Sequence, residues 1–246
     1  MAIGALIIGD EILSGKRQDR HLPHVVATLA ARGLGLDYAH YVGDDRGRLT
    51  ALLRDSFARG DLVFSFGGIG ATPDDHTRQA AAAALGVALE RHPEAVAELE
   101  ARFGADAYPN RVLMAEFPAG SRIIPNPFNR VAAFAIRDHQ FFPGFPQMAW
   151  PMVEWVLDTR YKDRFDTQKW GEAAILVYEA GESQLIAAME AIEKTFAGIK
   201  VFSLPSMGED GSRRHVELGV RGEPSKVAPA MEALRRLVAD AGFPYK

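Results

Sequence analysis

Hydrophobic and polar positions follow two rhythms in the first half of the chain. Short, continuous apolar runs alternate with longer segments in which an apolar residue recurs every three or four positions. The first pattern predicts buried parallel strands, and the second predicts amphipathic helices. The strands are predicted at residues 2–8, 36–42 and 62–66, and the helices at residues 21–32 and 49–57. This order favours an α/β fold whose doubly wound, mostly parallel sheet carries helices on both faces.

The alternation continues less regularly beyond residue 77. Alanine-rich composition and helical spacing of apolar residues predict further helices, and a strand pair follows. The helices are predicted at residues 77–85, 93–103 and 147–157, and the strand pair at residues 131–136 and 140–142. Residues 104–130 are rich in Pro and Asn, and we expect them to form an irregular loop.

A charged stretch with few apolar anchors, residues 161–169, predicts a domain boundary. We expect one domain at residues 1–165 and a smaller α+β domain at residues 169–246. Strands of the smaller domain are predicted at residues 173–178, 200–204 and 216–220, and helices at residues 182–196 and 224–241.

The composition argues against several classes of function. A net charge of −4 and the lack of a basic cluster argue against nucleic-acid binding. The chain contains no cysteine, which excludes disulfides, thiolate zinc sites and cysteine nucleophiles. We find neither a signal peptide nor an apolar run of the roughly 18 residues that cross a bilayer. We therefore expect a cytoplasmic protein with no nucleic-acid and no membrane partner.

The glycine-rich loop at residues 67–76 carries the most specific chemical signal. It joins a predicted strand to a predicted helix. Glycines such as Gly67, Gly68 and Gly70 let backbone N–H groups approach a phosphate closely, and the start of the following helix favours negative charge. The loop therefore predicts a ligand that carries phosphate.

Two adjacent carboxylates, Asp74 and Asp75, lie in the same loop. They would repel a phosphate unless a divalent cation such as Mg²⁺ bridges carboxylate and phosphate oxygens. The alternative is that Asp74, Asp75 and Thr77 only cap the following helix.

Three further loops are expected to meet the glycine-rich loop, because ligands of doubly wound sheets bind where the carboxyl ends of the strands converge. These loops are residues 9–11, 43–45 and 143–146. Acids gathered at one rim can hold a metal ion or act as a general base toward water. Alternatively each acid caps the helix that follows it, a role that suits Asp45.

Three residues outside these loops have side chains that can bind an anion or a metal ion: Arg111, His21 and His24. Arg111 is a candidate phosphate contact, with a structural ion pair as the alternative. His21 and His24 lack the i, i+4 spacing of a metal-binding pair, and we expect both at the surface.

Several of these segments, in this order, resemble a known family. Residues 67–77 read G-G-I-G-A-T-P-D-D-H-T and resemble the signature loop of the molybdopterin-binding MoaB/Mog-like superfamily, most closely its competence/damage-inducible protein A (CinA) branch. Similar motifs of that branch are G-D-E-I-L-S-G at 9–15, V-G-D-D at 42–45, N-R at 110–111, P-N-P at 125–127, F-P-G-F-P at 142–146 and G-E-S-Q-L at 181–185. Phe66, Ala71 and Phe145 depart from the family's usual Thr, Pro and Pro.

The resemblance implies a MoaB/Mog-like first domain, a KH-like second domain and alternative functions. One function is binding of molybdopterin. Another is a metal-dependent pyrophosphatase acting on ADP-ribose or a related nucleotide diphosphate. Beside what the resemblance implies, the alternatives are a non-catalytic molybdopterin- or nucleotide-binding module and an oligomeric scaffold. We expect a homo-oligomer. The resemblance does not extend to the carboxyl-terminal nicotinamide-mononucleotide deamidase domain of full-length CinA proteins, so we do not expect that activity of this chain.

For the enzyme, the resemblance implies that metal-bound water attacks a diphosphate. We predict Asp75 and Glu11 as catalytic residues. The predicted ligands of a Mg²⁺, Mn²⁺ or Co²⁺ ion are Asp75, Asp74 and Asp45. The predicted contacts of the pterin or nucleotide ligand are Gly67, Gly68, Gly70, Thr72, Asp10, Arg111, Pro143 and Gly144.

Overall fold

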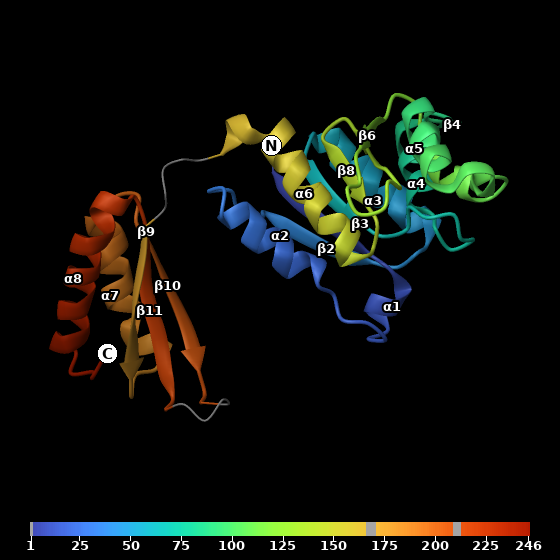
Figure 1. Ribbon diagram of the computed structural model, residues 1–246. Coiled ribbons are helices and arrows are strands. Elements are labelled where there is room, and N and C mark those ends of the chain that lie inside the picture. Colours follow the sequence, from blue (N-terminus) through green and yellow to red (C-terminus); the bar gives the residue numbers. More distant parts are fainter. Residues whose placement is uncertain (1, 166–170, 209–212) are drawn as a thin grey trace. The chain divides into compact units, whose positions relative to one another are not determined.

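In the computed structural model, which describes residues 2–165, 171–208 and 213–246, a six-stranded sheet forms the centre of the amino-terminal unit (Figure 1). The strand order is β2-β1-β3-β8-β7-β6. The first four of these strands are parallel to one another, and the last two pair antiparallel. Their bounds are β1 Ile3–Ile8, β2 Tyr38–Val42, β3 Leu62–Phe66, β6 Arg122–Ile124, β7 Ala133–Ile136 and β8 His139–Phe142. The predicted α/β fold with a mostly parallel sheet is confirmed.

Helices cover both faces of this sheet: α2 packs against α6 on one face, and α3 packs against α4 on the other (Figure 1). The helices are α1 Asp10–Leu13, α2 His21–Ala30, α3 Arg46–Arg59, α4 Thr77–Leu85, α5 Pro93–Phe103 and α6 Pro146–Arg160, with a 3₁₀ helix η3 at Lys162–Arg164. Local signals set their ends. Asp45 caps α3 by accepting a hydrogen bond from the Arg48 N–H at 2.7 Å. Gly60 and Gly86 end α3 and α4 in the left-handed region, which glycine enters at little cost.

Apolar side chains fill the space between the sheet and its helices. Every residue of β1 and β3 is buried, as expected for central parallel strands that are covered on both faces. Aromatic rings stack within the sheet, with centroid distances of 5.3 Å between Phe66 and Phe142 and 4.5 Å between Phe134 and Phe141. Each large side chain buried in this way stabilises the fold by roughly 1.5–3 kcal/mol.

The register of the parallel strands brings their carboxyl ends to one edge of the sheet. Ile8 at the end of β1 pairs with Val42 at the end of β2. Phe66 at the end of β3 pairs with Ile7 on one side and with Phe142, at the end of β8, on the other. The loops that follow these four strands therefore leave the sheet at the same edge.

Residues 104–130 are not the irregular loop that we predicted. They contain two 3₁₀ helices, η1 Gly104–Ala107 and η2 Arg111–Ala115, and two short strands, β5 Glu116–Pro118 and β6 Arg122–Ile124. β5 pairs with β4, Leu89–Arg91, and β6 pairs with β7. Strands of three residues are too short to show a hydrophobic period in the sequence. They form because pairing partners elsewhere in the chain satisfy their backbone hydrogen-bonding groups.

The carboxyl-terminal unit is a small α+β fold. Its antiparallel sheet has the strand order β10-β11-β9, and α7 and α8 pack against each other and against this sheet. The elements are β9 Gly171–Tyr178, α7 Glu182–Thr195, β10 Lys200–Ser206, β11 His215–Gly222 and α8 Pro224–Asp240. Buried Leu185, Leu218 and Leu234 belong to a core separate from that of the first unit.

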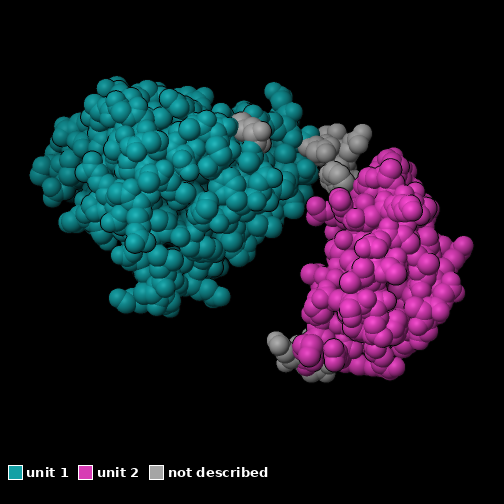
Figure 2. All heavy atoms as spheres, turned by 180° about the vertical axis from the view of Figure 1, so that it is seen from behind, with its two compact units in different colours: residues 1–165 teal, residues 166–246 magenta. Residues whose placement is uncertain are grey.

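The chain divides into two compact units, residues 1–165 and 166–246, which Figure 2 colours separately. Residue 169, the predicted start of the second domain, lies outside the described residues. In the described part of the chain, no helix combines the length and the apolar character needed to cross a membrane.

Candidate ligand-binding site

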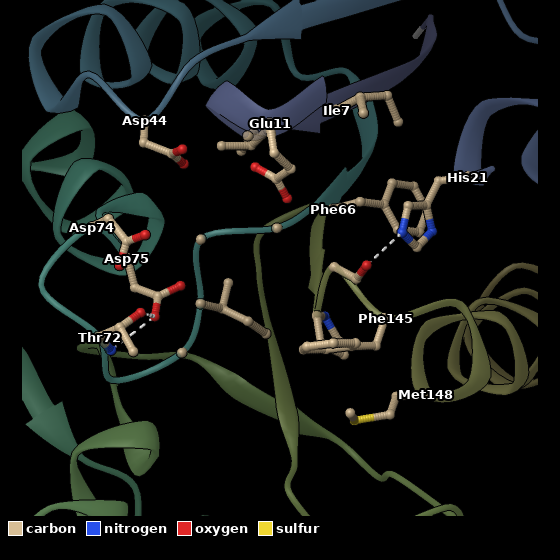
Figure 3. Close-up of a pocket in the computed structure, with 18 of the residues that line it drawn as sticks. Ile7, Glu11, His21, Asp44, Phe66, Thr72, Asp74, Asp75, Phe145 and Met148 are labelled. Carbon is tan, nitrogen blue, oxygen red and sulfur yellow. Dashed lines mark hydrogen bonds between the residues drawn. The ribbon is translucent and has the colours of Figure 1, made fainter. Parts of the chain in front are cut away.

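A pocket lies where the loops after β1, β2, β3 and β8 meet (Figure 3). Its volume is about 580 Å³, within the usual range for a site that encloses one small molecule. Residues from all four loops line it. The convergence rule for doubly wound sheets thus locates a real cavity in this fold.

Carbonyl groups of the glycine-rich loop are held by the first two residues of α4. The Thr77 hydroxyl donates to the Gly67 carbonyl and the Thr77 N–H donates to the Gly68 carbonyl, both at 2.9 Å. The Arg78 guanidinium donates from Nη2 to the Gly70 carbonyl at 2.6 Å. These bonds fix the orientation of three peptide units.

Amide groups of the same loop remain free. Among the described residues, the N–H groups of Gly68, Ile69, Gly70 and Ala71 donate to no protein acceptor. The C=O and N–H of a trans peptide point in opposite directions, so the N–H groups of Gly68, Ile69 and Ala71 point away from α4. A run of unpaired amides at such a loop can donate hydrogen bonds to an anion.

Two glycines are required by this geometry, and a third is closely approached by a side chain. Gly67 and Gly68 have φ values of 103° and 67°, in the left-handed region. A Cβ on Gly67 would lie 2.3 Å from the Ile8 carbonyl oxygen, and a Cβ on Gly68 would lie 2.3 Å from Thr77 Oγ1. A Cβ on Gly70 would lie 2.5 Å from the Asp75 carboxylate. Side chains are thus excluded where the loop turns.

One side of the pocket is acidic, with the carboxylates of Glu11, Asp44, Asp74 and Asp75 in its lining. Figure 3 shows that the Glu11 carboxylate points toward the glycine-rich loop. Asp75 Oδ2 accepts hydrogen bonds from the Thr72 N–H at 2.9 Å and from the Thr72 hydroxyl at 2.5 Å. Asp75 therefore closes a turn within its own loop and does not cap α4.

Asp44 is bound to the neighbouring loop by a reciprocal pair of hydrogen bonds. The Asp10 N–H donates to Asp44 Oδ2 at 2.9 Å, and the Asp44 N–H donates to Asp10 Oδ1 at 3.2 Å. Burial raises the pKa of Asp44, and the negative charges of Asp10, Glu11 and Asp74 raise it further against the lowering effect of the Asp10 N–H. This pair joins the loops after β1 and β2.

The acidic side does not fit a resident metal ion. Across residues 2–165, 171–208 and 213–246, no group of three or more His, Asp or Glu side chains is placed to hold one. The Asp75 oxygen nearest Gly70 is already engaged by Thr72, and the Glu11 carboxylate lies over Gly9, where a Cβ would meet it at 2.5 Å. We therefore derive no catalytic step through a metal.

The opposite side of the pocket is apolar and aromatic, with Phe66, Phe145 and Met148 in its lining (Figure 3). Phe145 is 53% exposed, so its ring is available to a ligand. A planar ring system fits such a surface, because aromatic faces favour stacking.

His21 belongs to this side, and our prediction of a surface position was wrong. It is 6% exposed, its ring stacks on Phe66 at 4.5 Å, and its Nε2 donates to the Gly144 carbonyl at 3.1 Å. Burial lowers the pKa of His21, and the hydrogen bond to Gly144 opposes that effect. The residue therefore holds the loop after β8 as a neutral imidazole.

Most of the predicted site residues lie together in the pocket lining. They are Glu11, Gly67, Gly68, Gly70, Thr72, Asp74, Asp75, Pro143 and Gly144. Asp10, Asp45 and Arg111 are not in the lining. Asp10 binds Asp44, Asp45 caps α3, and Arg111 donates to the Asp106 carbonyl at 2.7 Å and lies over the Phe103 ring.

Sequence reasoning did not select Asp44 or His21, although signals for both are present. Asp45 lies three residues before Arg48, whose N–H donates to its carboxylate, and this is the spacing of an N-cap. Asp44 is then the acid of the pair that faces the pocket. His21 lies four and eight residues before Val25 and Leu29, and all three are on the buried face of α2.

Comparison with known proteins places this chain in a family. Residues 4–162 match the model of a family described as "probable molybdopterin binding domain". A CinA-like protein of Anaeromyxobacter sp. (strain Fw109-5) is 40% identical over 148 residues, which are 57% of this chain and 36% of that protein. A CinA-like protein of Citrifermentans bemidjiense is 32% identical over 197 residues, 77% of this chain and 47% of that protein. The chain thus spans half or less of the length of these curated relatives.

A solved structure supports the same assignment. The protein CinA of unknown function from Thermoplasma acidophilum has a TM-score of 0.59 and 25% sequence identity, over 64% of this chain and 98% of that chain. Since the family model spans more than half of the sequence, this chain belongs to the molybdopterin binding domain family, with CinA-like proteins among its relatives.

Proposed function

We propose that the amino-terminal unit binds one small phosphate-bearing ligand of the pterin or nucleotide type in this pocket. The observation that carries the proposal is the run of free N–H groups at residues 68–71, held in place through carbonyls bound to α4. These N–H groups would take the phosphate oxygens. The ring system would lie against Phe145 and Met148 on the apolar side.

Two further observations support a ligand of this size and kind. A volume of about 580 Å³ suits one pterin or nucleotide, and the family is described as a "probable molybdopterin binding domain". The acidic wall at Glu11 and Asp44 lies beside the phosphate position and would accept hydrogen bonds from N–H or hydroxyl donors of the ligand.

Hydrolysis of ADP-ribose or a related nucleotide diphosphate is the second candidate function. The observation in its favour is the cluster of carboxylates, Asp75 and Glu11 among them, beside the anion site. Because the described residues do not form a metal site by themselves, a Mg²⁺, Mn²⁺ or Co²⁺ ion would have to be held partly by the ligand phosphates. We therefore propose binding as the function and treat turnover as an outcome of its test.

The test is isothermal titration calorimetry of the 246-residue chain with molybdopterin, ADP-ribose and AMP, with and without each divalent ion. Phe145→Ala is expected to weaken binding about tenfold, because one aromatic face stacked on a ring contributes about 1–3 kcal/mol. Phe128→Ala is the matched control: Phe128 is 62% exposed and lies outside the pocket lining, so its removal should leave affinity unchanged.

AMP release from ADP-ribose is followed in the same samples. Metal-dependent AMP that disappears in Asp75→Asn would establish the pyrophosphatase. Binding without AMP release would leave a binding module. Absence of binding to all three compounds, or equal weakening by Phe145→Ala and Phe128→Ala, would overturn the proposed site. The homo-oligomer and the cytoplasmic location stay predictions, and light scattering tests the first of them.

A further inference from the structure

Arg78, the second residue of α4, is an unusual buried cation. Its side chain is 3% exposed, yet within the described part of the chain it forms no ion pair with a carboxylate. It donates only to backbone carbonyls: Nη2 to Gly70, and Nη1 to Leu113 and to Glu116. Nε has no partner at all among the described residues. Buried charges in proteins are ordinarily paired, so this one lacks its usual counter-charge.

The carbonyl bonds connect Arg78 to the anion site. The Gly70 carbonyl and the Ala71 N–H belong to one peptide unit, so a cation bound at the oxygen polarises the N–H on the other side. The guanidinium also holds the glycine-rich loop to residues 113–116. A fixed positive charge therefore lies directly behind the free amides.

The carboxylates that act on Arg78 do so without forming an ion pair with it. Burial lowers the pKa of Arg78, while the charges of Glu116 and Asp75 raise it. The pKa of arginine lies so far above physiological pH that the Arg78 guanidinium stays protonated despite its burial. Glu116 pairs instead with Arg91 at 3.4 Å, at the protein surface.

We propose that Arg78 is the positioning residue of the anion site and that the phosphate of the ligand is its missing counter-charge. This inference rests on the proposed function and makes the charge of the phosphate a requirement for binding. The moiety at residues 68–71 carries a full negative charge, as a phosphate ester does, and is not a neutral hydroxyl or carbonyl group. Affinity then depends on the charge at position 78 as well as on its hydrogen bonds.

Two substitutions at position 78 separate charge from hydrogen bonding. Arg78→Gln keeps an amide donor and removes the charge, whereas Arg78→Lys keeps the charge and loses the planar fork. Calorimetry of the full chain with AMP at low salt is expected to show about tenfold weaker binding for Arg78→Gln and about threefold weaker binding for Arg78→Lys. A purely structural role predicts equal losses for both, with no rescue by lysine.

Glu116→Gln provides a test that does not depend on the folding of the Arg78 variants. The Glu116 side chain is 29% exposed and lies outside the pocket lining, and its charge partly offsets that of Arg78. Its neutralisation is expected to strengthen AMP binding about twofold, in the direction opposite to structural damage.

The outcomes distinguish failure of the proposed function from failure of the role of Arg78. If the wild-type chain binds none of AMP, ADP-ribose and molybdopterin, the proposed function fails and this inference fails with it. If the wild type binds AMP but Arg78→Gln and Arg78→Lys lose equal affinity, only the role of Arg78 fails. Should both variants be unfolded by circular dichroism, an unchanged AMP affinity in Glu116→Gln would overturn the inference.

Discussion

Gly68→Ala tests whether the shape of the glycine-rich loop is set by contact with α4. Gly68 has φ 67°, and a Cβ there would lie 2.3 Å from Thr77 Oγ1 and 3.3 Å from Thr77 Cβ. Gly86 provides a matched control, because it has φ 68° and a Cβ there would meet nothing within 4 Å. The two substitutions share their conformational cost and differ in the clash.

The expected magnitudes follow from these distances. An alanine in the left-handed region costs about 1–2 kcal/mol, which is the whole cost at Gly86. Overpacking against Thr77 adds about 1–3 kcal/mol at Gly68. For a unit of this size, where 1 kcal/mol shifts the Tm by about 2–4 °C, we expect the Tm to fall by about 10 °C for Gly68→Ala and about 4 °C for Gly86→Ala.

Thermal unfolding followed by tryptophan fluorescence measures both shifts, because Trp150 and Trp155 lie in α6 of the same unit. In a Thr77→Ala background the clashing oxygen is gone, so the additional cost of Gly68→Ala should fall toward that of Gly86→Ala. Equal Tm shifts for the two glycine variants, with no relief in the Thr77→Ala background, would refute the reasoning.

Two further predictions concern residues outside the pocket. Asp45→Ala should destabilise the fold by about 1 kcal/mol, because it removes the cap of α3, while AMP affinity stays unchanged; a loss of affinity as large as that of Phe145→Ala would contradict its placement outside the site. His139 is buried with Nε2 2.7 Å from Ser56 Oγ, and burial lowers its pKa to about 3. Below pH 6.5 the His139 imidazole takes up a proton in the unfolded chain but stays neutral in the folded chain. The contribution of His139 to the free energy of unfolding is therefore fully present above pH 6.5. It falls as the pH drops toward 3, by up to about 1.4 kcal/mol per pH unit. Urea unfolding between pH 7 and 5 should show this slope in the wild type and a smaller one in His139→Gln; identical slopes would contradict it.

The elements that can be predicted from the sequence are those whose own residues show a regular pattern of apolar positions. β1 and β3 are continuous apolar runs because both faces are covered, and α2 and α3 show helical spacing because one face is buried. β6 carries no such signal: it has three residues, and its pairing with β7 exists only in the folded chain. The formation of so short a strand depends on its pairing partner as much as on its own residues.

The same distinction applies to the pocket. The loops that form it could be predicted, since their position follows from the carboxyl ends of β1, β2, β3 and β8. The direction of each side chain could be predicted only as alternatives, and the capping role that suits Asp45 is one of them. Asp44 and Asp45 are adjacent and chemically identical, and a hydrogen bond from the Arg48 N–H decides that Asp45 turns to α3 while Asp44 lines the cavity.

In the glycine-rich loop, three carbonyl groups are hydrogen-bonded while the N–H groups of residues 68–71 are free, so NMR of these amide protons can report ligand binding. Protons on the amides of residues 68–71 have no protein acceptor, so in the free protein they should exchange quickly with solvent, unlike those of the neighbouring strand β3. An anion that occupied the proposed site would give acceptors to the N–H groups that point away from α4, those of Gly68, Ile69 and Ala71, and would slow their exchange and move their proton resonances downfield. These three backbone signals would then be enough to screen candidate compounds without an assay for turnover.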